Sequence, residues 1–165
     1  PSGVDPAAVV YGGTQLFEKT QNEMKRTSLS ISNPVKLIFV HSGKAVESTG
    51  EMVQKVAQKH QATDLSETFK AMGKITLQLK NQLQTGKLDG RLLSQNNRLL
   101  DTIGVVGKRA QKMISQIENW GGYAKITGAG GVRAGSGWIL VFAPNKHTEE
   151  KILASGWETF TSTVQ

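Results

Sequence analysis

Residues 123–142, YAKITGAGGVRAGSGWILVF, do most to decide the expected fold of this 165-residue chain. Tyr123–Thr127 and Trp138–Phe142 are rich in aromatic and aliphatic side chains and are typical of strands, the second a buried one. Between them, Gly128–Gly137 has glycine at five of ten positions, so its backbone can turn several N–H groups toward one anion. A long β-hairpin connection would use glycines equally well for its turns, so both interpretations stay open.

Further strands are predicted near both ends of the chain. Val9–Tyr11, Thr14–Lys19 and Val35–Val40 indicate β structure in the first forty residues. Thr148 is a candidate cap for a short helix that ends near Ala154. Residues 157–164 are rich in Thr, Phe and Val and predict a last strand.

The region between these strands has a helical period. Ser48–Glu51 matches a capping box, which predicts a helix that starts near Thr49. Asp64–Glu67 repeats the start signal, and an apolar stripe then continues to Gly86. Two more stripes end at Gly104 and before residue 121. Strands, a helical block and strands again predict an α+β fold, with helices packed on a largely antiparallel sheet.

The charge of the chain points to an anionic partner without saying which one. There are 20 Lys and Arg against 13 Asp and Glu, which gives a net charge of +7. The hydrophobic content of 38% is enough for a core, so the composition argues against disorder. The densest basic stretch, Lys108–Lys112, has helical spacing and no interleaved aromatic residue. A solvated helix face is therefore favoured over a nucleic-acid patch.

Several classes of site and location are excluded or disfavoured. Without cysteine, the chain has no disulfide, thiolate zinc site or cysteine nucleophile. No two of His41, His60 and His147 stand at zinc-ligand spacing. No apolar run reaches the roughly 20 residues of a membrane span, and Pro1–Asp5 lacks the features of a signal peptide. A soluble, cytoplasmic protein that does not bind a membrane is expected.

Two common phosphate motifs do not fit, and one carboxylate is a candidate base. Ser42–Lys44 lacks the first glycine of a Walker A loop, and no Gly-x-Gly-x-x-Gly follows a first strand, which disfavours a classical mononucleotide fold. Asp5 follows a flexible turn and could accept a proton from a substrate hydroxyl. An aspartate beside Gly and Pro is, however, more often a turn residue.

Two segments together resemble a known family. Pro1–Asp5 and Lys125–Gly131, in this order and separation, resemble the second half of a GHMP-family small-molecule kinase. The family has a Ser-Gly-x-Asp segment and a late Lys-x-Thr-Gly-Ala-Gly-Gly loop, with a strand and a Thr-initiated helix between them. Val35–Val40 and Thr49 match the latter two, so the resemblance covers essentially the whole chain.

The resemblance implies both a fold and an activity. It implies a ferredoxin-like C-terminal lobe at 34–165, preceded by a junction segment at 1–33 that carries the Ser-Gly-x-Asp motif. The implied reaction moves the γ-phosphoryl of ATP to a small hydroxy acid with Mg²⁺. Mevalonate is the favoured acceptor, and phosphomevalonate and homoserine are the alternatives. The ATP-binding N-terminal lobe is absent from this chain, so the segment alone is expected to be inactive.

The resemblance also implies roles for particular residues. Asp5 would be the catalytic carboxylate, and upstream residues rather than this segment would hold the metal. Thr49 would lie near the substrate, although a helix cap is an equally good interpretation of it. Val132 and Arg133 depart from the family, which usually continues with glycines. The remaining implied residues are Ser2 and Gly3 for the turn at the substrate, and Thr127, Gly128, Ala129, Gly130 and Gly131 for the phosphates.

Other partners and other functions also remain open. A homodimer is possible, because family members are often dimers. The rival interpretation is a noncatalytic module that binds an anion or nucleic acid through the glycine loop and the positive charge. A purely structural interaction domain is the third option.

Overall fold

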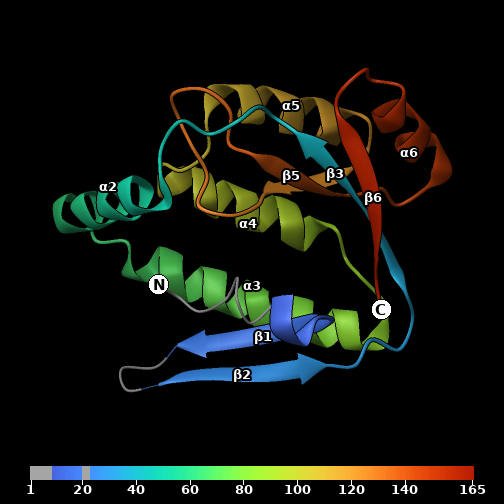
Figure 1. Cartoon of the computed structure of the whole chain (residues 1–165), viewed down its shortest axis with the longest axis horizontal. Helices are drawn as coiled ribbons and strands as arrows, with labels where there is room; N and C mark the ends of the chain where they lie inside the picture. The colour runs from blue at the N-terminus through green and yellow to red at the C-terminus, as the bar shows by residue number, and fades with distance from the viewer. Residues whose placement is uncertain (1–8, 20–22) are drawn as a thin grey trace.

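The structure is a computed structural model that describes residues 9–19 and 23–165. The predictions for Ser2, Gly3 and Asp5 lie outside the described residues. Figure 1 shows a hairpin on one side of a long helix, and on the other side a sheet with further helices around it.

The main sheet has four strands in the order β4-β5-β3-β6. They are β3 (Val35–His41), β4 (Tyr123–Ile126), β5 (Trp138–Phe142) and β6 (Thr159–Val164), and every neighbouring pair is antiparallel. The chain passes from β3 through a helical block to β4 and β5, then through α6 (Lys146–Leu153) to β6. This is the β-α-β-β-α-β connectivity of a ferredoxin-like fold, so the expected fold class is confirmed.

The helical block follows the predicted stripes and caps. Ser48 Oγ accepts from the N–H of Glu51, and the Glu51 carboxylate accepts from the N–H of Ser48, which confirms the capping box. The next helix ends at Gly86, whose φ of +67° is the left-handed conformation that glycine adopts at helix ends. The helices are α2 (Thr49–Ala62), α3 (Ser66–Thr85), α4 (Arg91–Thr102) and α5 (Lys108–Asn119).

The core lies between one face of the sheet and α5. Ile38 and Val40 share one face of β3, as the two-residue period of a strand requires, and they pack with the inward residues of β4 and β5. Leu37, on the opposite face, is also buried. The whole predicted stripe of α5 is buried here: Ala110, Met113, Ile114 and Ile117. By contrast, α2 buries only Met52, and Val53 is 63% exposed.

The hairpin forms a separate two-stranded sheet. It consists of β1 (Thr14–Lys19) and β2 (Met24–Leu29), paired antiparallel. Where the chain leaves β2, the N–H and Oγ of Ser32 both donate to the carbonyl of Gln84, near the end of α3. The hairpin is thereby attached to α3 rather than to the four-stranded sheet (Figure 1). The proposed junction at 1–33 stays a prediction.

Two local predictions were wrong. Val9–Tyr11 is helical rather than extended. The prediction failed because three apolar residues before a Gly pair are too few to show a period. Asn145, not Thr148, caps α6 by accepting from the N–H of Thr148 at 3.0 Å. The Thr148 hydroxyl instead points inward and donates to the carbonyl of Trp120.

Within residues 9–19 and 23–165, no helix combines the length and apolar character of a membrane span.

Candidate functional site at the glycine loop

The glycine loop begins at a closed neck between β4 and β5. The N–H and Oγ of Thr127 donate to the carbonyl of Trp138 at 2.9 and 3.0 Å. Gly128 and Gly130 then have φ angles of +65° and +79°, a region that a side chain disfavours. Gly130 also leaves no room for a side chain, because a Cβ there would lie 2.2 Å from the carbonyl oxygen of Val105.

The second half of the loop is held by buried hydrogen bonds. Gly131 donates its N–H to the carbonyl of Val105 at 3.1 Å. The Ser136 hydroxyl donates to the carbonyl of Gly131 at 2.7 Å and accepts from the N–H of Gly107 at 2.9 Å. Ser42, which is fully buried, accepts from the N–H of Ser136 at 3.0 Å. These bonds fix the loop against β3 and the start of α5.

The first half of the loop is open by comparison. Within the described part of the chain, the N–H groups of Gly128, Ala129 and Gly130 have no acceptor. Gly128 is exposed. Unpaired N–H groups in left-handed turns can bind an anion. The predicted phosphate role of Gly128–Gly130 is therefore compatible with the structure, whereas the N–H of Gly131 already has a partner.

Helix α2 borders this open half. The hollow between them measures ≈ 230 Å³. Thr49 stands one turn before Val53, on the same side of α2, and its exposed hydroxyl has no hydrogen-bond partner among the described residues. The cap is Ser48, so the structure leaves Thr49 free. The hollow is lined by Met52, Val53, Val56, Leu100, Ile103, Val105, Gly128 and Ala129.

A buried carboxylate closes the turn after Gly131. The Oε1 atom of Glu47 accepts from the N–H groups of Val132 at 3.2 Å and Arg133 at 2.9 Å. The Glu47 side chain is only 6% exposed, and the guanidinium of Arg133 lies 3.3 Å from the same oxygen. Burial acts to raise the pKa of Glu47, but the backbone N–H groups and Arg133 together lower it below its ordinary 4.5. Glu47 is therefore the anion that this turn binds.

Arg133 connects the loop to the start of α2. Its terminal nitrogen lies 3.4 Å from the Glu51 carboxylate, which also accepts from the N–H of Ser48. Hydrogen bonds from Ser48, with a smaller contribution from the charge of Arg133, lower the pKa of Glu51. The loop and the N-terminus of α2 thus form one connected unit.

Sequence reasoning missed Glu47, Ser42 and Ser136. Glu47 contacts Arg133 across 86 positions of sequence, and Ser42 contacts Ser136 across 94. Arg133 and Ser136 lie in the glycine loop, but their partners Glu47 and Ser42 lie outside it, and a polar residue between a strand and a helix is ordinary. No local signal could have identified them.

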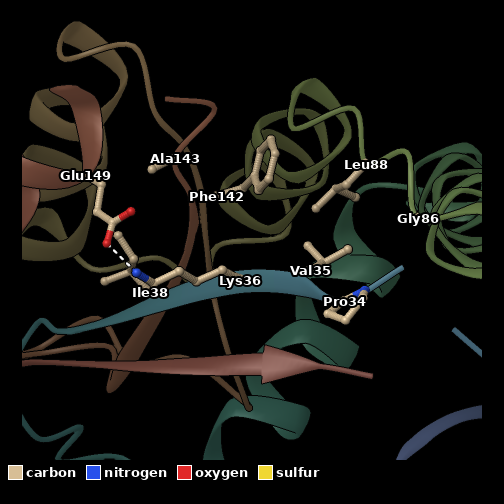
Figure 2. Close-up of a pocket in the computed structure, with 9 residues that line it drawn as sticks. All are labelled: Pro34, Val35, Lys36, Ile38, Gly86, Leu88, Phe142, Ala143 and Glu149. Carbon is tan, nitrogen blue, oxygen red and sulfur yellow. Dashed lines mark hydrogen bonds and ion pairs between the residues drawn. The ribbon is translucent and has the colours of Figure 1, made fainter. Parts of the chain in front are cut away.

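A second pocket lies near the opposite end of β3 and differs in character. Figure 2 shows Lys36 pointing toward Glu149, with which it forms an ion pair, beside the apolar side chains of Val35 and Phe142. The two charged groups of this pocket satisfy each other. No group of three His, Asp or Glu side chains within residues 9–19 and 23–165 could hold a metal ion.

Sequence comparison relates the chain to known kinases. No family model matches the chain. A mevalonate kinase of Archaeoglobus fulgidus is 34% identical over 133 residues, which cover 79% of this chain and 43% of that protein. A mevalonate kinase of Thermococcus onnurineus is 31% identical over 160 residues, which cover 90% of this chain and 44% of that protein. The matched part is the C-terminal half of these kinases.

Solved structures show the same fold. L. major mevalonate kinase in complex with R-mevalonate superposes with a TM-score of 0.85 at 23% identity, over 100% of this chain and 53% of that one. Streptococcus pneumoniae phosphomevalonate kinase, in complex with phosphomevalonate and AMPPNP, superposes with a TM-score of 0.75 at 13% identity. That match covers 99% of this chain and 56% of the other.

The chain belongs to the GHMP kinase family. It is similar to the C-terminal half of mevalonate kinases, as the two motifs indicated. It spans less than half the length of the Archaeoglobus fulgidus and Thermococcus onnurineus mevalonate kinases.

Proposed function

We propose that the chain is the C-terminal part of an ATP-dependent mevalonate kinase. The observation that carries the proposal is the open half of the glycine loop, whose unpaired N–H groups lie beside α2 in a chain similar to mevalonate kinases. A GHMP kinase has to stabilise the charge on a phosphoryl group during transfer. Fixed backbone N–H groups do this without reorganisation.

The proposed reaction assigns a role to each predicted residue except Gly131, whose N–H is bonded to Val105. Asp5 accepts the proton of the acceptor hydroxyl as its oxygen attacks the γ-phosphorus of ATP, and ADP leaves. The N–H groups of Gly128–Gly130 face the phosphoryl oxygens, and Thr127 fixes the loop at its neck. Thr49 contacts the acceptor from the start of α2. Ser2 and Gly3 shape the turn that presents Asp5.

The proposal requires parts beyond the described residues. Mg²⁺ is included because phosphoryl transfer from ATP commonly uses it to neutralise charge on the phosphates. Within residues 9–19 and 23–165 no group of three His, Asp or Glu side chains could hold a metal ion. The proposal assigns the ligands of Mg²⁺ to the ATP-binding lobe. A cytoplasmic location and a homodimer are further parts of the proposal.

Turnover of ATP to ADP by the protein from the complete reading frame tests the proposal. We expect turnover with mevalonate but not with phosphomevalonate or homoserine, and a loss of several orders of magnitude in Asp5→Asn. Absence of acceptor-dependent turnover in a folded, full-length protein would contradict it.

One observation favours a second candidate, a noncatalytic anion-binding module. The structure places Trp157 beside the basic stretch of α5, in a hollow of ≈ 380 Å³ lined also by Lys108, Arg109 and Lys112. This supplies the aromatic partner that the local sequence lacks. The candidate predicts nucleic-acid binding that weakens steeply with salt and persists in Asp5→Asn. Binding that is unchanged by Trp157→Ala would argue against it.

A further inference from the structure

The turn at Gly131–Arg133 has the geometry of an anion site, and its anion comes from the chain itself. Two successive N–H groups and a guanidinium converge on Glu47 Oε1 at 2.9 to 3.3 Å. The same arrangement of donors would hold a phosphate oxygen. The Glu47 side chain is only 6% exposed, so the loop encloses the carboxylate.

The second oxygen of Glu47 also faces the loop. Its Oε2 atom is buried and accepts no hydrogen bond from the described residues. A Cβ at Gly131 would lie 3.3 Å from this atom, and also 2.6 Å from the carbonyl oxygen of Gly135. Glycine at 131 therefore leaves the room that the carboxylate fills.

Glu47 separates the glycine loop into two parts. In the part after Gly131, the N–H groups of Val132 and Arg133 donate to Glu47, and the guanidinium of Arg133 forms an ion pair with it. On the other side, the N–H groups of Gly128–Gly130 remain unpaired. Without Glu47, a phosphate would find a second set of donors in the same loop. These are the N–H groups of Val132 and Arg133 and the guanidinium of Arg133.

We propose that Glu47 is a positioning residue that occupies the anion-binding turn at Gly131–Arg133 and thereby directs phosphate to Gly128–Gly130. This inference rests on the proposed function. It adds a residue outside the two motifs to the site, and it explains why the loop tolerates Val132 and Arg133. With the turn filled by a carboxylate, those positions need no close approach of a ligand.

Phosphate titration of the full-length protein, with ¹⁵N label in valine and arginine, tests the occupancy directly. In the wild-type protein we expect the Val132 and Arg133 amide resonances to stay in place as inorganic phosphate is added. In Glu47→Gln, which keeps the size of the side chain but loses its charge, both should shift saturably. The additional change Arg133→Gln should weaken that response. Equal shifts in the wild-type protein, or none in Glu47→Gln, would overturn the proposal.

Kinetics supply the functional readout. Glu47→Gln should lower kcat/KM by about tenfold, because a displaced phosphate is poorly oriented for transfer. It should also become inhibited by inorganic phosphate, which a merely structural defect would not cause. Glu47→Asp retains the charge and should recover part of the activity. Glu150→Gln, on the surface of α6, removes an equal charge and should behave as the wild type.

The two proposals fail in distinguishable ways. If the wild-type enzyme has no acceptor-dependent turnover, the kinase function is wrong, and the amide titration alone decides the role of Glu47. If the kinase is active but Glu47→Gln retains wild-type kcat, KM and phosphate insensitivity, the positioning role is wrong.

Discussion

At the scale of single residues, two adjacent hydroxyls at the start of α2 have different tasks. Ser48 caps the helix and is bonded in both directions to Glu51. Thr49 has no bonded partner among the described residues and is exposed beside the glycine loop. A substitution at each position therefore separates the stability of α2 from a role in binding.

We expect Ser48→Ala to lower the free energy of unfolding by about 1 kcal/mol, because one N–H at the helix start loses its acceptor. Thr49→Ala should change stability by less than about 0.5 kcal/mol. In the full-length enzyme it should raise KM for the acceptor, and Thr49→Ser should restore it. Urea denaturation and steady-state kinetics measure the two effects. Equal destabilisation by both alanine variants would contradict this division.

The carboxylates at the loop predict a dependence of stability on pH. The pKa values of Glu47 and Glu51 lie below their ordinary 4.5 in the folded protein. A lowered pKa contributes stability that is present above the unfolded-state value and is lost as the pH falls through the folded-state value. Stability should therefore decrease below about pH 4.5.

Thermal unfolding from pH 6 to pH 3 measures this dependence. The decrease should be shallower in Glu47→Gln than in the wild-type protein. A parallel decrease in the two proteins would show that Glu47 does not contribute to it.

At the scale of elements, the glycines of the loop are not equivalent. A Cβ at Gly135 would lie 2.0 Å from the carbonyl oxygen of Gly43, and one at Gly130 would lie 2.2 Å from that of Val105. At Gly128 nothing lies within 4 Å, and only its φ of +65° disfavours a side chain. Backbone contact, rather than the φ angle alone, therefore decides where the loop requires glycine.

We expect Gly130→Ala and Gly135→Ala to destabilise the protein by about 3 kcal/mol or more, because backbone atoms must move apart. Gly128→Ala should cost about 1 kcal/mol for its left-handed conformation. Gly73→Ala is the matched control within α3, where the space is open, and should stabilise by about 0.5–1 kcal/mol. Chemical denaturation of the four variants checks this order, and similar costs at Gly128 and Gly135 would refute it.

At the scale of the whole molecule, packing of the hairpin, α3 and the sheet encloses a cation. Lys125 on β4 lines a hollow of ≈ 500 Å³ together with Phe17 of β1, Leu79 of α3 and Leu140 of β5. Its ammonium group has no carboxylate partner among the described residues. Burial lowers the pKa of Lys125 below its ordinary 10.5.

Lys125→Met should therefore raise the free energy of unfolding at pH 7 by about 1 kcal/mol, since the charged form is disfavoured in the fold. A lysine with a lowered pKa makes the protein more stable as the pH rises through the folded-state value toward 10.5. This rise should be absent in the methionine variant. Denaturation between pH 7 and pH 10 measures it, and a methionine variant less stable at pH 7 would contradict the argument.

The local periodicities of the sequence determined most of the elements. The stripe of α5, the capping box at Ser48 and the glycine end of α3 involve neighbours within one or two turns, so local rules suffice to predict them. The glycine loop and its flanking strands were likewise identifiable, and they carried the family resemblance. The prediction of β structure for Val9–Tyr11 was wrong because the segment is too short to show a period.

Only the tertiary structure decided which part of the loop is open. The N–H of Gly131 is bonded to Val105, and those of Val132 and Arg133 are bonded to Glu47, while residues 128–130 remain unpaired. These partners are brought together by the packing of α2, α5 and the sheet. Their separation in sequence leaves no local trace, because a hydrogen bond depends on position in space and not on spacing along the chain.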